Sequence, residues 1–489
     1  MKNDDLKRPK FTKVSDYVFE IPKSYVKGML VPARVYADKR LLDQMDTRVF
    51  EQIANVSSLP GIQEHSLVMP DGHSGYGFPI GGVAAFDPED GGVISPGGIG
   101  FDINCGMRLI LTNLKVNDIK NKIKELVDGL FSAIPTGVGN SSRLNINREE
   151  FRKLAENGSR WTVEKGWGYE EDLKGTELNG FADWADVSKI SEKAISRGLK
   201  QIGTLGSGNH YLEIQQVKKE NIEDEKIAEK WGIFPDQIVI MLHTGSRGAG
   251  HQIATDYVQR FSALSESKNG IKVNDKELVC APFLSNEGQD YYKAMGCGVN
   301  IALANRQAIT HAVRQVFSKV LKRSPDKLGM ELLFDVAHNR ASLERHSIGK
   351  SEKELLIHRK GSTGSYAPGR KEIPRKFRKD GSPVIIGGSM ETGSYLLVGS
   401  AGSEDTFSST CHGSGRTKSR SQARKSTDGE KLFNDMLKKG VYVKSASWAG
   451  LAEESGDSYK DIDSVVDVIH SAGISRKVCK LLPLGNIKG

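Results

Sequence analysis

The sequence predicts an α+β fold, a single large domain over residues 1–489 in which helices surround β-sheets. Three observations support this prediction. The 489 residues are 38% hydrophobic, which is enough apolar material for a large core. Short β-branched runs and longer helical runs follow one another without regular alternation, which disfavours a doubly wound sheet or a barrel of βα units. The chain also has no Pro- or Ser-rich linker and no repeat with a period of about 20 to 50 residues.

Composition excludes several other classes of protein. With 69 Lys and Arg, 61 Asp and Glu and a net charge of +8, the balance of charge and apolar residues excludes a disordered or fibrous chain. No run approaches the roughly 18 apolar residues of a membrane helix, and the polar start lacks the apolar segment of a signal peptide. We therefore expect a soluble, cytoplasmic protein. Five scattered cysteines, an odd number, do not indicate a disulfide framework.

The first half of the chain is predicted to hold short strands, tight turns and three helices. Its apolar runs are broken by proline and glycine, and the glycines cluster near His, Asp, Cys and Ser, where they let the backbone approach a ligand closely. The expected segments are strands and turns over 17–36, a helix over 40–55, a β-rich stretch over 66–113, helices over 115–132 and 184–200, and a polar connection over 140–179.

The second half is predicted to hold one long helix among short strands. Apolar residues recur at helical spacing from about residue 286 to 321. The other apolar runs are short and end in glycine-rich turns, which is typical of strands. These strands are expected over 203–215, 237–244, 332–336, 384–386, 394–398 and 441–443.

Two segments, residues 370–379 and 416–425, are strongly basic and flank a segment rich in Gly, Ser and His. A charge run is most often a solvated surface. Two such runs on either side of a small-residue segment favour a site for polyphosphate or a nucleic-acid backbone.

Five residues have the chemistry of metal ligands. Asp102 and Cys105 lie three apart on a turn, so both can face one point. His210, His243 and His338 each stand where a strand meets a polar turn. Each residue alone is more often structural, as a buried thiol or a hydrogen-bonded imidazole. Together they could hold two metals if the fold brings them together, with a thiolate or carboxylate as the bridge.

His412 has a different setting, between small residues and ahead of a basic segment. A neutral imidazole nitrogen can attack phosphorus and form a covalent intermediate, with Arg416 placed to hold phosphate oxygens. A surface histidine in a loop is the alternative interpretation. Neither a P-loop nor a strand-linked Gly-x-Gly-x-x-Gly signature is present.

A series of motifs resembles the RtcB-type RNA ligases, in order from about residue 20 to the last residue. The motifs include Pro-Asp-Gly-His-Ser-Gly-Tyr-Gly (70–77), Asp-Ile-Asn-Cys-Gly (102–106), Gly-Ser-Gly-Asn-His-Tyr-Leu-Glu (206–213), His-Thr-Gly-Ser-Arg-Gly (243–248), Asp-Val-Ala-His-Asn (335–339), His-Arg-Lys-Gly (358–361), Gly-Ser-Met (388–390), Cys-His-Gly-Ser-Gly-Arg (411–416) and the closing Lys-Gly.

The resemblance implies joining of an RNA 3′-phosphate or 2′,3′-cyclic phosphate end to a 5′-hydroxyl end, using GTP and two Mn²⁺ per chain. A guanylylated histidine would pass GMP to the RNA 3′-phosphate, and attack by the 5′-hydroxyl would then release GMP. The expected partners are RNA, as tRNA halves or broken ends, and an optional activating protein. A monomer is our default expectation.

The resemblance also implies roles for individual residues. His412 would be guanylylated, and Asp102, Cys105, His210, His243 and His338 would hold the two metals in a central cleft, with Cys105 bridging. The residues implied in nucleotide binding are Asn209 on the phosphate, Glu213, Lys488, Ser389 and Ser394 on guanine, Tyr459 against the base, and Ser414 and Arg416 beside them. Ligand chemistry alone favours zinc, because thiolate and imidazole suit a softer ion; manganese is implied by the resemblance only.

The chain departs from the family pattern in three places. An arginine expected after His-Arg-Lys-Gly is Gly364, Glu391 stands where glycine is common, and the chain ends in Gly-Asn-Ile-Lys-Gly. These departures affect the expected substrate preference more than the guanylylation step. Two alternatives stay open, a metal-dependent phosphohydrolase acting on cyclic phosphates and an RNA-binding scaffold without catalysis.

Overall fold

The computed structural model describes residues 7–137, 139–265, 267 and 270–489 of the chain. It has the α+β architecture that the sequence predicts, built on two large sheets. The first sheet has seven strands, antiparallel except for the pair β3 and β4. Its order is β1 (Thr12–Ser15), β2 (Val18–Ile21), β3 (Ala33–Tyr36), β4 (Ser66–His73), β5 (Ile80–Phe86), β13 (Ser351–Lys360) and β12 (Asn339–Ile348).

The second sheet has eight strands and joins segments that are far apart in the sequence. Its order is β11 (Leu332–Ala337), β7 (Gly106–Ile110), β9 (Gln237–Thr244), β8 (Tyr211–Val217), β19 (Ser475–Lys488), β16 (Ser394–Gly399) and β15 (Pro383–Ile386), with β18 (Tyr442–Ser445) paired to β19. Two small ribbons complete the strands, β6 (Val93–Ile94) with β10 (Ala281–Pro282) and β14 (Ser362–Gly364) with β17 (Ser409–Cys411).

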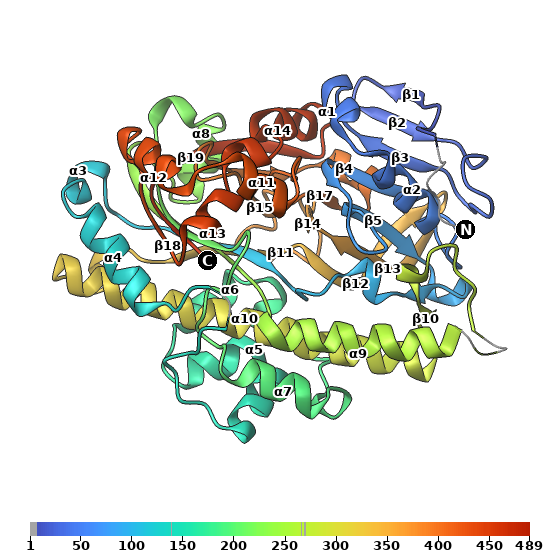
Figure 1. Ribbon diagram of the computed structural model, residues 1–489, viewed down its shortest axis with the longest axis horizontal. Coiled ribbons are helices and arrows are strands. Elements are labelled where there is room, and N and C mark those ends of the chain that lie inside the picture. The colour runs from blue at the N-terminus through green and yellow to red at the C-terminus, as the bar shows by residue number, and fades with distance from the viewer. Residues whose placement is uncertain (1–6, 138, 266, 268–269) are drawn as a thin grey trace.

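A 36-residue helix, α10 (Asn286–Leu321), runs beneath both sheets and carries α5 on its outer side (Figure 1). Its N-terminus is capped by Ser285, whose side chain accepts from the amide of Gly288. The other helices are α1 (Lys39–Gln44), α2 (Thr47–Val56), α3 (Val116–Ile119), α4 (Ile123–Ala133), α5 (Arg148–Glu164), α6 (Glu170–Lys174), α7 (Glu192–Leu199), α8 (Glu225–Lys230), α9 (Arg247–Ser265), α11 (Arg420–Ser426), α12 (Gly429–Lys438), α13 (Trp448–Glu453) and α14 (Ile462–Ser471).

The long helix and the strand at 237–244 lie where the sequence predicts them, but other boundaries were wrong. The single helix expected over 40–55 is two helices, because Asp46 caps a new one by accepting from the amide of Arg48. The helix expected over 115–132 is likewise split into α3 and α4, and the one over 184–200 shortens to α7. The strand expected over 203–215 begins only at Tyr211, where β8 starts.

The expected polar connection over 140–179 was also wrong, because it contains α5 and α6. A capping box between Asn147 and Glu150 starts α5, and its apolar face, with Phe151 and Leu154, is buried in the core that α10 shares. Among the described residues no helix is both long and apolar enough to span a bilayer. All five cysteines are buried free thiols.

Candidate active site

One edge of the eight-stranded sheet collects the predicted ligands. The strands β11, β7, β9 and β8 are neighbours and antiparallel, so the end of one lies beside the start of the next. Cys105 comes directly before β7 and His210 directly before β8, while His243 is the penultimate residue of β9 and His338 directly follows β11. Register pairs such as Met107 with His243 fix this alignment. The fold therefore brings together residues that are more than two hundred positions apart in the sequence.

Two groups of donor atoms share the Cys105 thiol. Its Sγ lies 3.3 Å from Nε2 of His210 and 3.3 Å from Nε2 of His243. Asp102 Oδ2 is 2.9 Å from His210 Nε2, and His338 Nε2 is 3.2 Å from His243 Nε2. Within each group, Asp102–Cys105–His210 and Cys105–His243–His338, the donor atoms lie within 4.8 Å of one another. This arrangement fits two metal ions with the thiol between them.

The ring orientations suit metal binding through Nε2. Nδ1 of His210 lies 3.0 Å from the carbonyl of Leu205, and Nδ1 of His243 lies 2.9 Å from the carbonyl of Asn209. A carbonyl only accepts, so Nδ1 of His243 carries the proton and its Nε2 is left with its lone pair. Nδ1 of His210 also lies 3.0 Å from Nη1 of Arg247, which only donates, and Nε2 of His210 faces the Asp102 carboxylate, so the Leu205 contact does not fix the tautomer of His210. Burial lowers the pKa of His243 and of His338 well below the ordinary value, which keeps these rings neutral.

The two acidic groups of the cluster are shifted in opposite directions. Burial and the neighbouring Asp102 raise the pKa of the Cys105 thiol well above its ordinary value. Burial would also raise the pKa of Asp102, but His210 and Arg247 outweigh it and hold that pKa below the usual range. Without a cation the thiol is therefore protonated, and a bound metal would have to displace this proton.

A buried ion pair supports the turn that carries Asp102 and Cys105. Arg306 of α10 donates from Nη1 to the carbonyl of Asn104 at 2.8 Å and makes two hydrogen bonds of 2.8 Å to Asp335 of β11. Arg108 also binds Asp335, at 2.7 Å, and all three side chains are fully buried. The long helix thus fixes the turn before Cys105 and the strand before His338 at the same time.

His412 lies beside this cluster and is oriented by Asp71. Nδ1 of His412 is 2.6 Å from Asp71 Oδ2, and the same oxygen accepts from the backbone amides of His412 and Gly413. The carboxylate holds the proton on Nδ1, so Nε2 is the free nitrogen. The rings of His412 and His338 have centroids 4.9 Å apart. A ring nitrogen with a free lone pair therefore lies next to the candidate metal ligands.

Two adjoining cavities open onto this cluster. The larger, of about 700 Å³, is lined by Asp102, Cys105, His338 and His412 and by several arginines. The smaller, of about 40 Å³, lies between His412 and the C-terminal strand. The two cavities share four lining residues, which are Asn209, His412, Ser414 and Tyr459.

The residues predicted to bind nucleotide fall into two sets. Asn209, Ser389, Ser414, Tyr459 and Lys488 line the small cavity, and Arg416 lines the large one. The hydroxyl of Ser414 is buried and has no hydrogen-bond partner among the described residues, as expected of a group that contacts a ligand.

Glu213 and Ser394 lie behind the cavity wall instead of lining it. Glu213 is on the same face of β8 as Tyr211, which does line the cavity. Its carboxylate accepts from the side-chain amides of Gln215 and Asn486. Burial raises the pKa of Glu213 to about 7, against the opposing effect of Lys488.

Two residues of the site were missed by the sequence reasoning. Glu454 is almost fully buried and accepts from Arg416 at 3.1 Å, from Tyr459 and from Lys488 at 3.5 Å, so it joins three predicted nucleotide contacts. Asp71 is the other. It stands in the Pro-Asp-Gly motif, but nothing in the sequence pairs it with a histidine 341 positions later.

The departures from the family pattern are accommodated locally. A Cβ on Gly364 would lie 2.8 Å from the ring of Tyr366, so this position in β14 is closely packed. Glu391 accepts from the amide of Gly456 at 2.8 Å and pairs with Lys439 at 3.1 Å. Glu391 therefore ties the loop before Tyr459 to the end of α12.

The fold and this site fit an enzyme in which a histidine lies beside a candidate metal cluster of thiol, carboxylate and imidazole groups. Comparison with known proteins gives the family: its model, described as tRNA-splicing ligase RtcB, matches residues 52–489. The chain is 50% identical to the tRNA-splicing ligase RtcB of Archaeoglobus fulgidus over 98% of both chains. It is 49% identical to that of Thermococcus kodakarensis (96% of this chain, 97% of the relative) and 48% identical to that of Methanococcus maripaludis (98% and 99%). The chain belongs to the RtcB family and is an RNA ligase.

Proposed function

We propose that this protein is a GTP- and Mn²⁺-dependent ligase that joins RNA 3′-phosphate or 2′,3′-cyclic phosphate ends to 5′-hydroxyl ends in tRNA splicing or RNA repair. Residues 1–489 act as one ligase domain, as a cytoplasmic monomer, with or without an activating protein. The observation that carries the proposal is the position of His412, whose ring lies 4.9 Å from that of His338 and whose Nδ1 is held by Asp71.

The candidate metal residues fit a pair of divalent cations. Asp102, Cys105 and His210 would hold one ion, and Cys105, His243 and His338 the other. When bound, the ions would neutralise phosphate charge at the reacting phosphorus. The donor set itself would also suit zinc. The assignment to manganese rests on the family resemblance.

The first step is attack by His412 on GTP. Nε2 forms a bond to the α-phosphorus, the bond to the β-phosphate oxygen breaks, and pyrophosphate leaves. Asp71 keeps the proton on Nδ1 and stabilises the positive charge that develops on the ring. Arg416 lines the larger cavity, where its positive charge favours phosphate, while most of its N–H groups donate within the protein and hold it in place.

In the second step an oxygen of the RNA 3′-phosphate attacks the phosphorus on His412, the P–N bond breaks and the histidine is restored. In the third the 5′-hydroxyl oxygen attacks the RNA phosphorus, its proton is lost to solvent, and GMP leaves. A 2′,3′-cyclic phosphate is first opened by water. Glu454 supports the nucleotide throughout, because it fixes Tyr459 and Lys488 at the small cavity.

Covalent labelling tests the proposal. GTP labelled at the α-phosphate is mixed with the protein with and without Mn²⁺, and the label retained after denaturation is counted. We expect label on the wild type with Mn²⁺, none on His412→Ala, and wild-type labelling of the control His311→Ala, whose histidine lies on α10 outside both cavities. Absence of label on folded, metal-loaded wild type would refute the guanylylation route and favour the phosphohydrolase alternative.

A further inference from the structure

A second large cavity, of about 620 Å³, lies apart from the active site, and we call it the distal basic pocket. It shares no lining residue with the two active-site cavities. Asn339 lines the active-site cavity and Arg340 lines the distal basic pocket, and successive residues of a strand face opposite sides. The two sites therefore lie on opposite faces of the start of β12.

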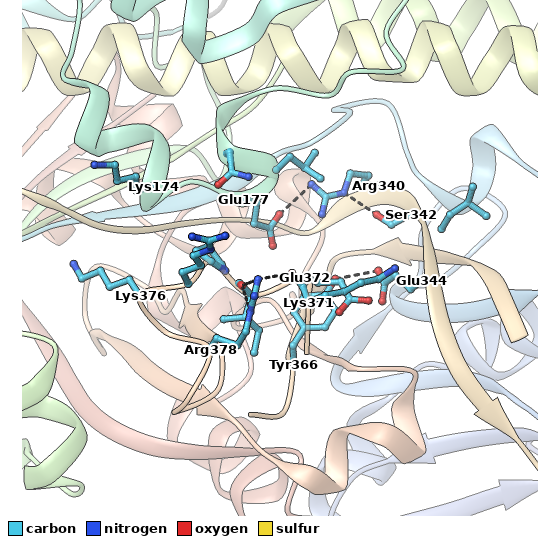
Figure 2. Close-up of a pocket in the computed structure, with 16 residues that line it drawn as sticks. Lys174, Glu177, Arg340, Ser342, Glu344, Tyr366, Lys371, Glu372, Lys376 and Arg378 are labelled. Atoms are coloured by element: carbon cyan, nitrogen blue, oxygen red, sulfur yellow. Dashed lines mark hydrogen bonds and ion pairs between the residues drawn. The ribbon is translucent and has the colours of Figure 1, made fainter. Parts of the chain in front are cut away.

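Cations dominate the lining of the distal basic pocket. Figure 2 shows lysines and arginines from α6, β12 and the 370–379 segment around one hollow. The six cationic residues are Lys174, Arg340, Lys371, Arg375, Lys376 and Arg378.

The three acidic residues of the lining are each neutralised by an arginine. Glu177 pairs with Arg340 at 3.0 Å. Glu372 receives two hydrogen bonds from Arg370, at 3.0 and 3.2 Å. The third, Glu344, is nearly fully buried; it accepts from the Arg359 guanidinium and from the hydroxyl of Tyr366, which is 3.0 Å away.

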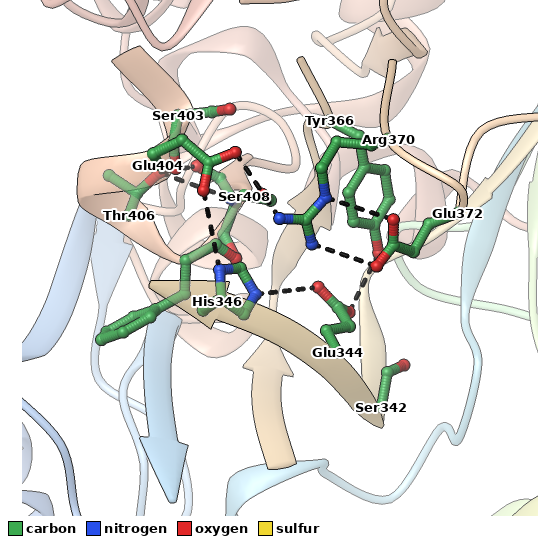
Figure 3. Close-up of polar contacts among 12 residues, drawn as sticks. Ser342, Glu344, His346, Tyr366, Arg370, Glu372, Ser403, Glu404, Thr406 and Ser408 are labelled. Carbon is green, nitrogen blue, oxygen red and sulfur yellow. Dashed lines mark hydrogen bonds and ion pairs between the residues drawn. The ribbon is translucent and has the colours of Figure 1, made fainter. Parts of the chain in front are cut away.

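The contacts of Glu344 and Glu372 belong to one network at the base of the 370–379 segment. His346 lies between Glu344 and Glu404, at 3.4 and 3.8 Å, and Glu404 also pairs with Arg370 at 3.6 Å (Figure 3). Each carboxylate of the lining is thus paired with an arginine. None of them is left to balance the other cations of the distal basic pocket. Among the described residues, Lys371, Arg375, Lys376 and Arg378 have no carboxylate partner.

The loop that carries these cations is held in place. Ile373 and Phe377 are buried in the core, where Phe377 packs edge-on against Trp231 and Phe334. Arg378 donates to the backbone carbonyls of Lys371 and Ile373, which closes the loop on itself. The exposed side chains of Lys371, Arg375 and Lys376 therefore project from a fixed frame.

The other basic segment of the sequence is different. Arg416 pairs with Glu454, and Arg424 with Glu453 at 2.6 Å. Arg420 is 3.8 Å from the same Glu453. Two carboxylates therefore pair with three of its cations. In the described part of the chain, Lys371, Arg375, Lys376 and Arg378 of the distal basic pocket have no such pairing and are left for a ligand.

We propose that the distal basic pocket binds backbone phosphates of the substrate RNA at a distance from the joined ends; this rests on the proposed ligase function. Several unbalanced cations on a fixed frame are typical of phosphate recognition. A nucleotide base would find little to stack on, because the Tyr366 ring is almost fully buried and its hydroxyl is bonded to Glu344. The pocket therefore recognises RNA by charge and not by sequence.

The test compares a triple variant of the pocket, Lys371→Gln with Arg375→Gln and Lys376→Gln, with a control that loses the same charge from the surface near the first sheet. The control is Lys10→Gln with Lys23→Gln and Lys27→Gln, three exposed lysines that line neither the distal basic pocket nor the active-site cavities. Affinity for a fluorescent single-stranded RNA with no reactive ends is measured at several salt concentrations, and binding of inorganic tripolyphosphate is measured by calorimetry.

We expect the pocket variant to bind the RNA more weakly and to reduce the slope of log K against log salt by about 2, because each phosphate contact contributes about 0.7 for a single strand. The control should match the wild type. RNA affinity and salt slope equal to those of the control would overturn the proposal. Loss of tripolyphosphate binding with unchanged RNA binding would also overturn it and assign the pocket to a free polyphosphate.

Guanylylation by GTP alone separates this proposal from the ligase proposal, because that step involves no RNA. If the wild type is labelled at His412 and the pocket variant binds RNA as the control does, the proposed ligase function is supported and the proposed distal RNA site is refuted. Unlabelled wild type would instead remove the ligase function, whatever the RNA affinities are.

Discussion

Replacing Asp71 with asparagine should slow guanylylation without unfolding the protein. The side chain of Asp71 is fully buried, and its Oδ2 accepts from His412 Nδ1 at 2.6 Å and from the amides of His412 and Gly413 at 3.1 and 3.3 Å. Asparagine is nearly isosteric and can still accept from the two amides. It carries no charge, so it can no longer stabilise a cationic His412 ring.

The size of this effect follows from the bond that is lost. A hydrogen bond to a charged group contributes about 1.5–3 kcal/mol. At about 1.36 kcal/mol per tenfold change in rate, the single-turnover rate of labelling should fall by roughly 10- to 150-fold. The loss should appear in the rate of the covalent step and not in the affinity for GTP, because Asp71 lines neither cavity.

The assay is a rapid-quench measurement of label transfer from GTP to the protein at saturating GTP. The matched control is Asp87→Asn, because Asp87 is also buried and charge-paired, with Lys353 at 2.7 Å, but does not contact His412. Thermal melts would check that both variants fold. A labelling rate for folded Asp71→Asn within about twofold of the control would refute the idea that Asp71 activates His412.

Four further predictions follow from the buried charges. Burial raises the pKa of Glu213 to about 7, so GTP affinity should rise between pH 6 and pH 8 as the guanine-accepting carboxylate forms, and calorimetry should find this rise missing in Glu213→Gln. Asp335→Ala leaves two buried arginines unpaired and should lower the free energy of unfolding in urea by about 3–5 kcal/mol. Burial lowers the pKa of His346, but the neighbouring carboxylates of Glu344 and Glu404 raise it by more. The resulting pKa lies above the ordinary 6.5. The stability difference between wild type and His346→Gln should therefore be fully present below pH 6.5 and decline as pH rises above it. Co²⁺ should give a thiolate charge-transfer absorbance and release a proton on binding to the wild type, and neither on binding to Cys105→Ser.

The sequence was sufficient to predict the α+β class, because one helix of 36 residues and many short strands leave clear periodic signals. It could not predict the sheet order. The edge that gathers Cys105, His210, His243 and His338 depends on β7, β8, β9 and β11 being neighbours, and pairing between distant strands is decided by tertiary packing.

The candidate site was predicted unevenly for the same reason. Residues with distinctive chemistry, such as Cys105 and His412, could be selected by type and setting. Asp71 and Glu454 could not, because an acidic residue in a turn or helix end is common and only the fold reveals its partners. The guanine contact of Glu213 stays a prediction, and the structure adds the side-chain amides of Gln215 and Asn486 as donors to its carboxylate, which only the fold reveals.

The central claim, that this chain seals RNA through the 3′-phosphate, is tested most directly by following that phosphate. An RNA labelled at its 3′-phosphate is incubated with a 5′-hydroxyl RNA, GTP and Mn²⁺, and the products are treated with phosphatase. We predict that the label becomes resistant to phosphatase, within a longer RNA, with the wild type and not with His412→Ala. Label that stays phosphatase-sensitive on unjoined RNA, or a ligated product whose joining phosphate is unlabelled, would contradict the account.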